Sequence, residues 1–120
     1  MWRDTYRGYD GYLLERNDRR ILFGGDTALS DSFAKLRASG PIDLAMMPIG
    51  LHSLDSHCTS EQAAQMAYEA DAHFTMPVHH QTFLFGSARL REPINRFQAT
   101  LRESPERIAV REIGETVVLP

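Results

Sequence analysis

The alternation of apolar and polar positions divides the chain into short strands and amphipathic helices. Residues 9–15 and 20–24 are predicted as two strands of a hairpin, because the polar segment 16–19 joins them as a turn. The run 43–49 is apolar at almost every position, which is typical of a strand buried on both faces. A further short strand is predicted at 73–78.

Helical patterns fill the segments between these strands. Ser30 or Asp31 is predicted to cap a first helix, which Gly40-Pro41 ends. The sequence from Thr59 to Gln62 is that of a capping box. Apolar residues then recur on one stripe of the second helix: Ala63, Met66, Ala67 and Ala70. Pro93 suits the first turn of a third helix, whose inward face holds Ile94, Phe97 and Leu101.

The predicted order is β-β-α-β-α-β-α-β-β, and its last two strands, 107–112 and 115–120, form a closing hairpin around Ile113-Gly114. This alternation predicts an α/β domain with a mixed sheet. Ligands of such sheets bind at the carboxyl ends of the strands. The chemistry-bearing residues at predicted strand ends of this kind are Asp26, His52, His57, His79 and His80.

The composition is that of one compact globular domain: 120 residues, with 42% hydrophobic positions. The formal net charge of -3 disfavours a nucleic-acid-binding surface. No apolar run approaches the length of a membrane span, and the first residues have no apolar signal core. A single cysteine, Cys58, excludes an internal disulfide and fits a reducing compartment, so we expect a cytoplasmic protein.

Asp26 follows a predicted strand and two glycines, and two interpretations of it stay open. Gly24 and Gly25 allow a tight turn or the close approach of another group. Asp26 could then bind a metal, with Thr27 as a hydrogen-bond partner of its carboxylate. Alternatively, Asp26 is a turn or helix-cap residue, a common use of its short polar side chain. Spacing alone favours the second interpretation.

The histidines offer metal ligands and a proton carrier. Neutral imidazole suits zinc, but the side chains of neighbouring residues in an extended chain point in opposite directions. At most one of His79 and His80 should therefore face the same site as Asp26. His57 is a candidate for substrate binding or acid–base chemistry, because imidazole titrates near neutral pH. Each of these histidines, and His52 and His73 even more, could instead be structural or solvated.

Two weaker signals lie nearby. Cys58 precedes a helix N-terminus and could act with His57 as a nucleophile, although a half-buried structural cysteine is the simpler interpretation. Residues 83–85, Phe-Leu-Phe, could form an apolar lip for a lipid-like substrate, or pack beneath their loop.

Five motifs in a fixed order are more specific than any one of them: RRILFGGDTA, GPIDLAMMPIG, HCTSEQAA, MPVHHQTF and EPINRF. Together with the opening RGYDGYLLE, they resemble the C-terminal half of the metallo-β-lactamase-fold hydrolases. The branch that they resemble most is the N-acylphosphatidylethanolamine-hydrolysing phospholipase D and its bacterial relatives. The resemblance covers essentially the whole chain.

The resemblance implies a fold and a site. The family fold is an αββα sandwich of two similar halves, so this half would hold a mixed sheet with helices on one face. One or two zinc ions bind at an edge between the halves. By motif, Asp26 resembles the metal-bridging carboxylate and His79 the last metal-binding histidine. His57 matches a histidine near the substrate, which implies a catalytic or substrate-binding role, and no role carries over to His80.

The chain also departs from the family pattern. The main family signature, His-x-His-x-Asp-His, belongs to the N-terminal half and is absent from residues 1–120. Because a catalytic zinc site needs about three protein ligands and an open position, Asp26 and His79 alone do not complete one. We therefore expect residues 1–120 to be a single, partial domain: a fragment that exposes one face of its sheet and self-associates or pairs with a missing N-terminal half.

The resemblance implies a zinc-dependent hydrolase in the intact protein. Its metals would activate water near neutral pH and stabilise charge on a phosphoryl or carbonyl oxygen. The expected substrate is a phosphodiester, including a phospholipid, while a lactone or an amide stays open because the fold does not fix the function. The alternative from a different class is a non-catalytic assembly or dimerisation module.

Overall fold

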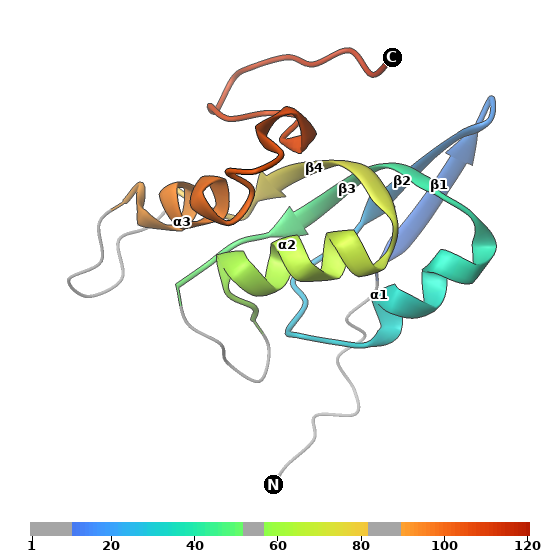
Figure 1. Ribbon diagram of the computed structural model, residues 1–120, viewed down its shortest axis with the longest axis horizontal. Coiled ribbons are helices and arrows are strands. Elements are labelled where there is room, and N and C mark those ends of the chain that lie inside the picture. Colours follow the sequence, from blue (N-terminus) through green and yellow to red (C-terminus); the bar gives the residue numbers. More distant parts are fainter. Residues whose placement is uncertain (1–10, 52–56, 82–89) are drawn as a thin grey trace, which may run out of the picture.

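The computed structural model describes residues 11–51, 57–81 and 90–120. At its centre lies a mixed sheet in the order β1-β2-β3-β4 (Figure 1). Its strands are β1 (Tyr12–Arg16), β2 (Arg19–Phe23), β3 (Ile42–Pro48) and β4 (Ala72–Val78). The first pair is antiparallel, and β2, β3 and β4 run parallel to one another. The predicted α/β class with a mixed sheet is confirmed. The four predicted strands are also present, although residues 9 and 10 of the first one lie outside the described residues.

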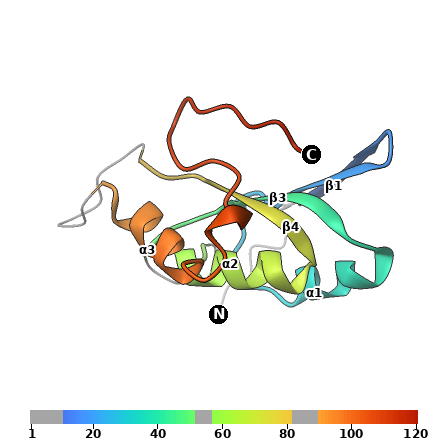
Figure 2. The same cartoon turned by 45° about the horizontal axis from the view of Figure 1, so that its top comes forward.

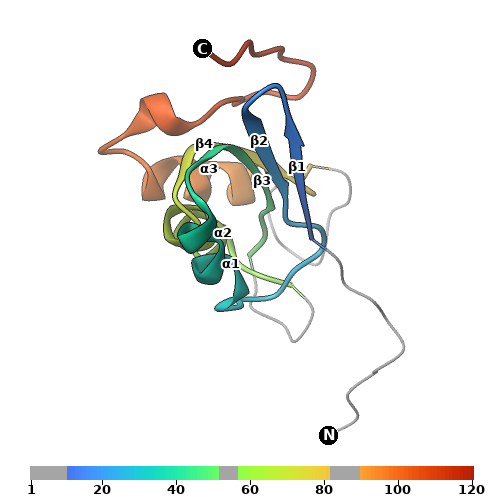
Figure 3. The ribbon, with the colours of Figure 1, turned by 90° about the vertical axis from the view of Figure 1, so that its right-hand side faces the viewer.

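Helices cover one face of this sheet, as expected for half of a sandwich (Figures 2 and 3). They are α1 (Ser32–Lys35), α2 (Ser60–Glu69) and α3 (Glu92–Thr100), with the 3₁₀ turns η1 (Leu36–Ser39) and η2 (Pro105–Arg107). Each parallel connection, from β2 to β3 and from β3 to β4, contains a helix, which is the usual way to join parallel strands. The parallel strands therefore end at the same edge of the sheet.

The core lies between the helices and the sheet. Leu22 and Met47 supply it from the strands, Met66 from α2, and Ile94 and Phe97 from α3. All five side chains are almost completely buried. The predicted stripe of α2 is confirmed, because all of its members belong to this core: Ala63, Met66, Ala67 and Ala70.

The capping box at the start of α2 is confirmed. The hydroxyl of Thr59 accepts a hydrogen bond from the backbone N–H of Gln62 at 3.1 Å, and the Gln62 side chain accepts one from the N–H of Thr59 at 2.9 Å. We expect Thr59→Ala to lower the free energy of unfolding by about 0.5–2 kcal/mol, because one orphan N–H loses its partner. Urea denaturation of the variant beside Thr100→Ala tests this. Thr100 lies at the opposite end of a helix, where its hydroxyl donates only to the Arg96 carbonyl, so equal losses in the two variants would contradict the prediction.

The hairpin turn between β1 and β2 is also confirmed. Asn17 and Asp18 have φ angles of 50° and 62°, which match the left-handed pair of residues in a type I′ turn. Their short polar side chains tolerate this region better than most others do. The register then pairs Tyr12 with Phe23 and Leu14 with Ile21 across the hairpin.

The first helix is shorter than predicted. Asp31 is its N-cap, but no side-chain capping bond is present there. Instead the Ser30 hydroxyl accepts from the N–H of Ser32 at 3.1 Å. Phe33 is the buried residue of this helix, and Leu36, in the 3₁₀ turn that follows, packs against the same core.

The predicted closing hairpin at 107–112 and 115–120 is wrong. The chain leaves η2 and makes one parallel bridge, Ile108 with Thr75, on the free edge of β4. Beyond it the Glu115 carboxylate accepts from the N–H groups of Arg111 and Glu112, which folds a local turn instead of a strand. Val118 is 87% exposed, so the apolar character of this segment does not reflect burial among the described residues.

The face of the sheet away from the helices is apolar and partly open. Tyr12, Leu14 and Phe23 are 55%, 56% and 38% exposed. They alternate along the strands with Leu13 and Leu22, which face the helices. A large exposed apolar surface of this kind marks a face that another element can cover. Among the described residues, no helix is long and apolar enough to cross a membrane.

Candidate functional site

The carboxyl ends of β2 and β4 bring Asp26 and His79 together. Asp26 comes three residues after the end of β2, and His79 directly follows β4. The distance from Asp26 Oδ1 to His79 Nε2 is 3.7 Å, and both side chains are partly exposed, at 61% and 45%. The parallel order β2-β3-β4 explains how two residues far apart in the sequence meet, since all three strands end at this edge.

The separation of these two atoms fits a shared metal ion. Two zinc ligands at about 2.1 Å across a tetrahedral angle lie about 3.4 Å from each other, close to the observed 3.7 Å. A carboxylate oxygen and an imidazole nitrogen are also donors that zinc accepts. The described residues contain no group of three or more potential ligands, so the pair accounts for part of a site.

The local backbone is built to present Asp26. The N–H of Gly24 donates to the Met46 carbonyl at 2.9 Å, which keeps the end of β2 against β3. A Cβ on Gly24 would lie 2.8 Å from the Met47 sulfur, so a larger residue there would collide with the core. Gly25 has a φ of 65°, which turns the chain away from the strand. The predicted glycine turn is confirmed.

Asp26 does not cap the helix that follows, because that position belongs to Asp31. The predicted bond from Thr27 to the Asp26 carboxylate is also absent, since the Thr27 hydroxyl donates to the Ala28 carbonyl at 2.8 Å. The helix-cap interpretation is thus wrong, whereas the interpretation of Asp26 as a turn residue agrees with the bend at this position. Its carboxylate lies beside the ring of His79.

His79 has a left-handed backbone, with a φ of 66°. Such conformations are uncommon outside glycine and cost on the order of 1–3 kcal/mol, and they cluster at functional sites. His79 Nε2 lies 3.7 Å from Asp26 Oδ1, and the neighbouring His80 is partly buried. Burial, together with the positive charges of Arg91 and His79, lowers the pKa of His80 from its ordinary 6.5, although a backbone hydrogen bond at Val78 opposes the shift. The 3.7 Å approach places His79 beside Asp26, while for His80 the expectation that it points away from the site stays a prediction.

His57 joins the pair from the chain that precedes α2. Its ring stacks on that of His79, with the ring centroids 5.4 Å apart and the planes 27° from parallel. Its imidazole is therefore placed beside the candidate metal-binding residues without being one of them. His73 lies at the opposite, amino end of β4, where its ring contacts Phe74, so it takes no part in the site. His52 and the predicted apolar lip at 83–85 lie outside the described residues.

Cys58 is a structural residue, and the interpretation of Cys58 and His57 as a thiol hydrolase is wrong. Its side chain is 3% exposed, and the thiol donates to the Pro48 carbonyl at 3.2 Å. Burial raises the pKa of the thiol to about 11, which removes the thiolate that nucleophilic chemistry needs.

The raised pKa of Cys58 predicts a specific loss of stability at alkaline pH. The folded thiol ionises at about 11 and the unfolded one at 9.0, so this group stabilises the fold below pH 9 and loses its contribution as the pH rises to 11. The loss is on the order of 2–3 kcal/mol. Urea denaturation of wild type and Cys58→Ala from pH 8 to 11 measures it. The difference between the two proteins should shrink across this range, and a constant difference would contradict the assignment.

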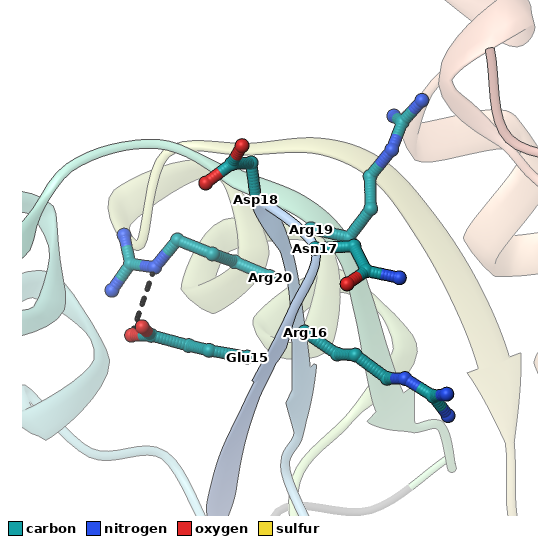
Figure 4. A pocket seen from close by; sticks show the side chains of 6 residues that line it. All are labelled: Glu15, Arg16, Asn17, Asp18, Arg19 and Arg20. Atoms are coloured by element: carbon teal, nitrogen blue, oxygen red, sulfur yellow. Dashed lines mark hydrogen bonds and ion pairs between the residues drawn. The ribbon is translucent and has the colours of Figure 1, made fainter.

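A shallow hollow beside the hairpin turn is a poor candidate for a ligand site. It is lined by the turn residues and their neighbours (Figure 4): Glu15, Arg16, Asn17, Asp18, Arg19 and Arg20. The three arginine side chains point away from one another. Arg20 is already engaged by Glu15, at 3.2 Å, and by the Pro41 carbonyl, at 3.0 Å. The hollow also lies at the amino end of β2, at the opposite edge of the sheet from Asp26.

One ion pair near the carboxyl edge of the sheet could not be predicted from the sequence. Arg96 of α3 binds Glu61 of α2 through two hydrogen bonds, of 2.8 and 3.0 Å. No local pattern relates the two residues, which belong to different helices, so only the folded arrangement reveals the contact.

Comparisons with known proteins identify the family of this chain. Residues 6–80 match the family described as the beta-lactamase superfamily domain. An uncharacterized protein of Mycobacterium tuberculosis is 29% identical, over 92% of this chain and 35% of its own length. A UPF0173 metal-dependent hydrolase of Shouchella clausii is 31% identical, over 91% of this chain and 44% of its own length. The chain thus spans less than half the length of these relatives.

Solved structures give the same fold. Igni18, a metallo hydrolase from the archaeon Ignicoccus hospitalis, superposes with a TM-score of 0.68 and 25% identity, over 89% of this chain and 44% of that one. The metallo-β-lactamase fold protein YhfI of Bacillus subtilis superposes with a TM-score of 0.53 and 18% identity, over 80% of this chain and 36% of that one. The second likeness concerns the fold alone.

Proposed function

Because this chain belongs to the metallo-β-lactamase superfamily, we propose that it is part of a zinc-dependent hydrolase in which Asp26 and His79 bind the metal. The observation that carries the proposal is the 3.7 Å approach of their Oδ1 and Nε2 atoms at the carboxyl edge of the sheet. Relatives that are named metal-dependent hydrolases support it. The remaining ligands would come from the other half of an αββα sandwich, packed on the apolar face that holds Tyr12, Leu14 and Phe23.

Zinc bound here would activate water near neutral pH and stabilise negative charge on the reacting oxygen of the substrate. The Asp26 carboxylate would hold the ion and offset part of its charge. His79 would bind through Nε2, the atom that faces Asp26. The left-handed backbone of His79 directs this ring toward the β2 end of the edge.

We assign His57 a role beside the metal. Its ring stacks on His79 and is only partly buried, so it can reach both solvent and a bound substrate. Imidazole can hold a proton near neutral pH and transfer it to a leaving oxygen. A phosphodiester, including an N-acylphosphatidylethanolamine-like phospholipid, is the proposed substrate, on the strength of the motifs shared with that branch of the family.

Hydrolysis assays test this function on the zinc-loaded chain together with the N-terminal half that is proposed to supply the remaining ligands. The substrates are bis(p-nitrophenyl) phosphate, an N-acylphosphatidylethanolamine vesicle and a simple lactone. We expect turnover of a phosphodiester, a fall of about 10²–10⁴-fold in His57→Gln as for the loss of a general acid or base, and no change in His73→Gln. Turnover of the lactone alone would contradict the proposed substrate, and equal activity of the two histidine variants would contradict the role of His57.

A second candidate function rests on the open sheet face. Tyr12, Leu14 and Phe23 expose apolar surface together, which would also suit an assembly module that pairs through this face. In a symmetric dimer, two copies of Asp26 and His79 could supply four ligands. Light scattering separates the two functions: a monomer at micromolar concentration would exclude the assembly module, whereas a dimer without metal would favour it over the hydrolase.

A further inference from the structure

One guanidinium joins three separate segments near the candidate site. Arg96 Nε and Nη2 donate to the two carboxylate oxygens of Glu61, at 2.8 and 3.0 Å. Its Nη1 donates to the Leu51 carbonyl at 3.3 Å. Only arginine offers donors in such a fixed planar fork, so a lysine at this position could not make all three bonds at once.

These contacts hold the chain on both sides of residues 52–56, which lie outside the described part of the structure. Leu51 is the last described residue before them and His57 the first after them. Glu61 is the second residue of α2, four positions after His57. Arg96 therefore fixes where the chain leaves β3 and where it returns to α2.

A buried polar contact beside Arg96 reinforces the same junction. Ser60 is completely buried, and its backbone N–H donates to the Gly50 carbonyl at 2.8 Å. Its hydroxyl donates to the Pro93 carbonyl at 2.7 Å, which ties α2 to the first turn of α3. Pro93 and Arg96 therefore tie the start of α2 to α3, and Gly50 ties it to the chain that follows β3.

The ion pair between Arg96 and Glu61 favours the charged form of Glu61, although both side chains are partly exposed. Burial alone would raise the pKa of Glu61, but the hydrogen bonds from Arg96, from the Glu61 backbone and from Thr59, together with the positive charge of Arg96, outweigh it and hold that pKa below its ordinary 4.5. Glu61 therefore stays ionised at neutral pH and keeps its two hydrogen bonds to Arg96, whose Nη1 donates to the Leu51 carbonyl.

We propose that Arg96 is a positioning residue, which holds His57 against the ring of His79 by anchoring Leu51 and Glu61 on either side of it. An effect of Arg96 on catalysis rests on the proposed function of His57 and His79, whereas its effect on the position of the His57 ring does not. Arg96 acts through the chain that carries His57, by its bonds to Leu51 and Glu61.

A ring-to-ring NMR contact tests this directly. The measurement is the nuclear Overhauser cross-peak between the imidazole protons of His57 and His79 in the metal-free chain, with the melting temperature recorded beside it. Four variants are compared: Arg96→Gln, Arg96→Lys, the swap Glu61→Arg/Arg96→Glu, and the control Arg102→Gln. Arg102 is 80% exposed and pairs only with Glu103 among the described residues.

We expect the cross-peak in wild type and in the control, and its loss in Arg96→Gln and Arg96→Lys. The swap restores the ion pair between the helices, and with it the melting temperature, but a glutamate at position 96 cannot donate to the Leu51 carbonyl. The cross-peak should therefore stay lost in the swap, which a purely structural role of the ion pair would not produce. Arg96→Lys keeps the charge, so the test survives if Arg96→Gln fails to fold.

Two outcomes would overturn the proposal: a cross-peak that persists in the folded Arg96 variants, or one missing from wild type. Failure of the proposed function is a separate result. If the wild-type chain shows the predicted cross-peak pattern but hydrolyses no phosphodiester when loaded with zinc and paired with the N-terminal half, the hydrolase assignment falls and the positioning role of Arg96 stays intact.

Discussion

Truncation of Phe97 to alanine is expected to lower the free energy of unfolding by about 3–5 kcal/mol. Phe97 is completely buried and is one of the largest fully buried side chains among the described residues. It belongs to the inward face of α3 and to the core cluster that includes Met66 and Leu22. Its removal takes away both the buried apolar area and the contacts around it, and α3 has only Ile94 as a second fully buried anchor.

Urea denaturation with Ile113→Ala as the matched control measures this effect. Ile113 is also a large apolar residue, but it is 67% exposed, so its truncation should change the free energy of unfolding by less than about 0.5 kcal/mol. Similar losses in the two variants would mean that α3 does not pack in the core as described. A loss of α3 packing would also release the Arg96 contacts, since Arg96 neighbours Phe97 on this helix.

Replacement of Asp26 or His79 by alanine is expected to weaken zinc binding by more than about 100-fold. Loss of a partner outside the metal's own ligands already costs about 10–100-fold in affinity, and these residues are proposed as ligands. Each variant would leave a single donor at the edge where two now approach to 3.7 Å. The stability of the fold should change little, because both side chains are partly exposed.

Zinc titrations of Asp31→Ala and His73→Ala are the controls. Asp31 is an exposed carboxylate without a capping bond, and His73 is an exposed imidazole at the opposite edge of the sheet. Both controls should bind zinc as wild type does. If they weaken binding as much as the site variants, the metal is held by surface charge in general rather than by Asp26 and His79.

Local signals in the sequence were enough for most of the fold. The hairpin follows from a polar turn whose Asn17 and Asp18 accept a left-handed backbone. The all-apolar run of β3 predicts a strand with neighbours on both sides, and it indeed lies between β2 and β4. Thr59 and Gln62 mark the start of α2 through a bond pattern that needs only four residues. In each case the interaction that fixes the element is local or set by a simple periodicity.

The closing segment shows where such signals fail. Residues 107–112 and 115–120 have the apolar character of strands, but a strand forms only where an edge with matching register is available. The edge of β4 accepts only Ile108 and Ala109, and the Glu115 carboxylate then captures two backbone N–H groups for a turn. Neither fact can be derived from β-propensity.

For the candidate site, the sequence predicted the residues but not their arrangement. Parallel strands place Asp26 and His79 at one edge, but no local pattern predicts the left-handed backbone of His79 or the 3.7 Å approach of its ring to the carboxylate. The stacking of His57 on His79 and its support from Arg96 depend on contacts between separate helices and loops. Such contacts leave no periodic signal in one sequence.

An NMR titration of the nitrogen-labelled chain with zinc, which follows the side-chain nitrogens of all observable histidines, tests whether Asp26 and His79 form part of a metal site. We expect the largest shift at Nε2 of His79, with accompanying changes at Asp26 and the stacked ring of His57, and no change at His73. A response centred on His73, or none at His79 at zinc concentrations that saturate the protein, would contradict the assignment of this edge of the sheet as part of a metal site.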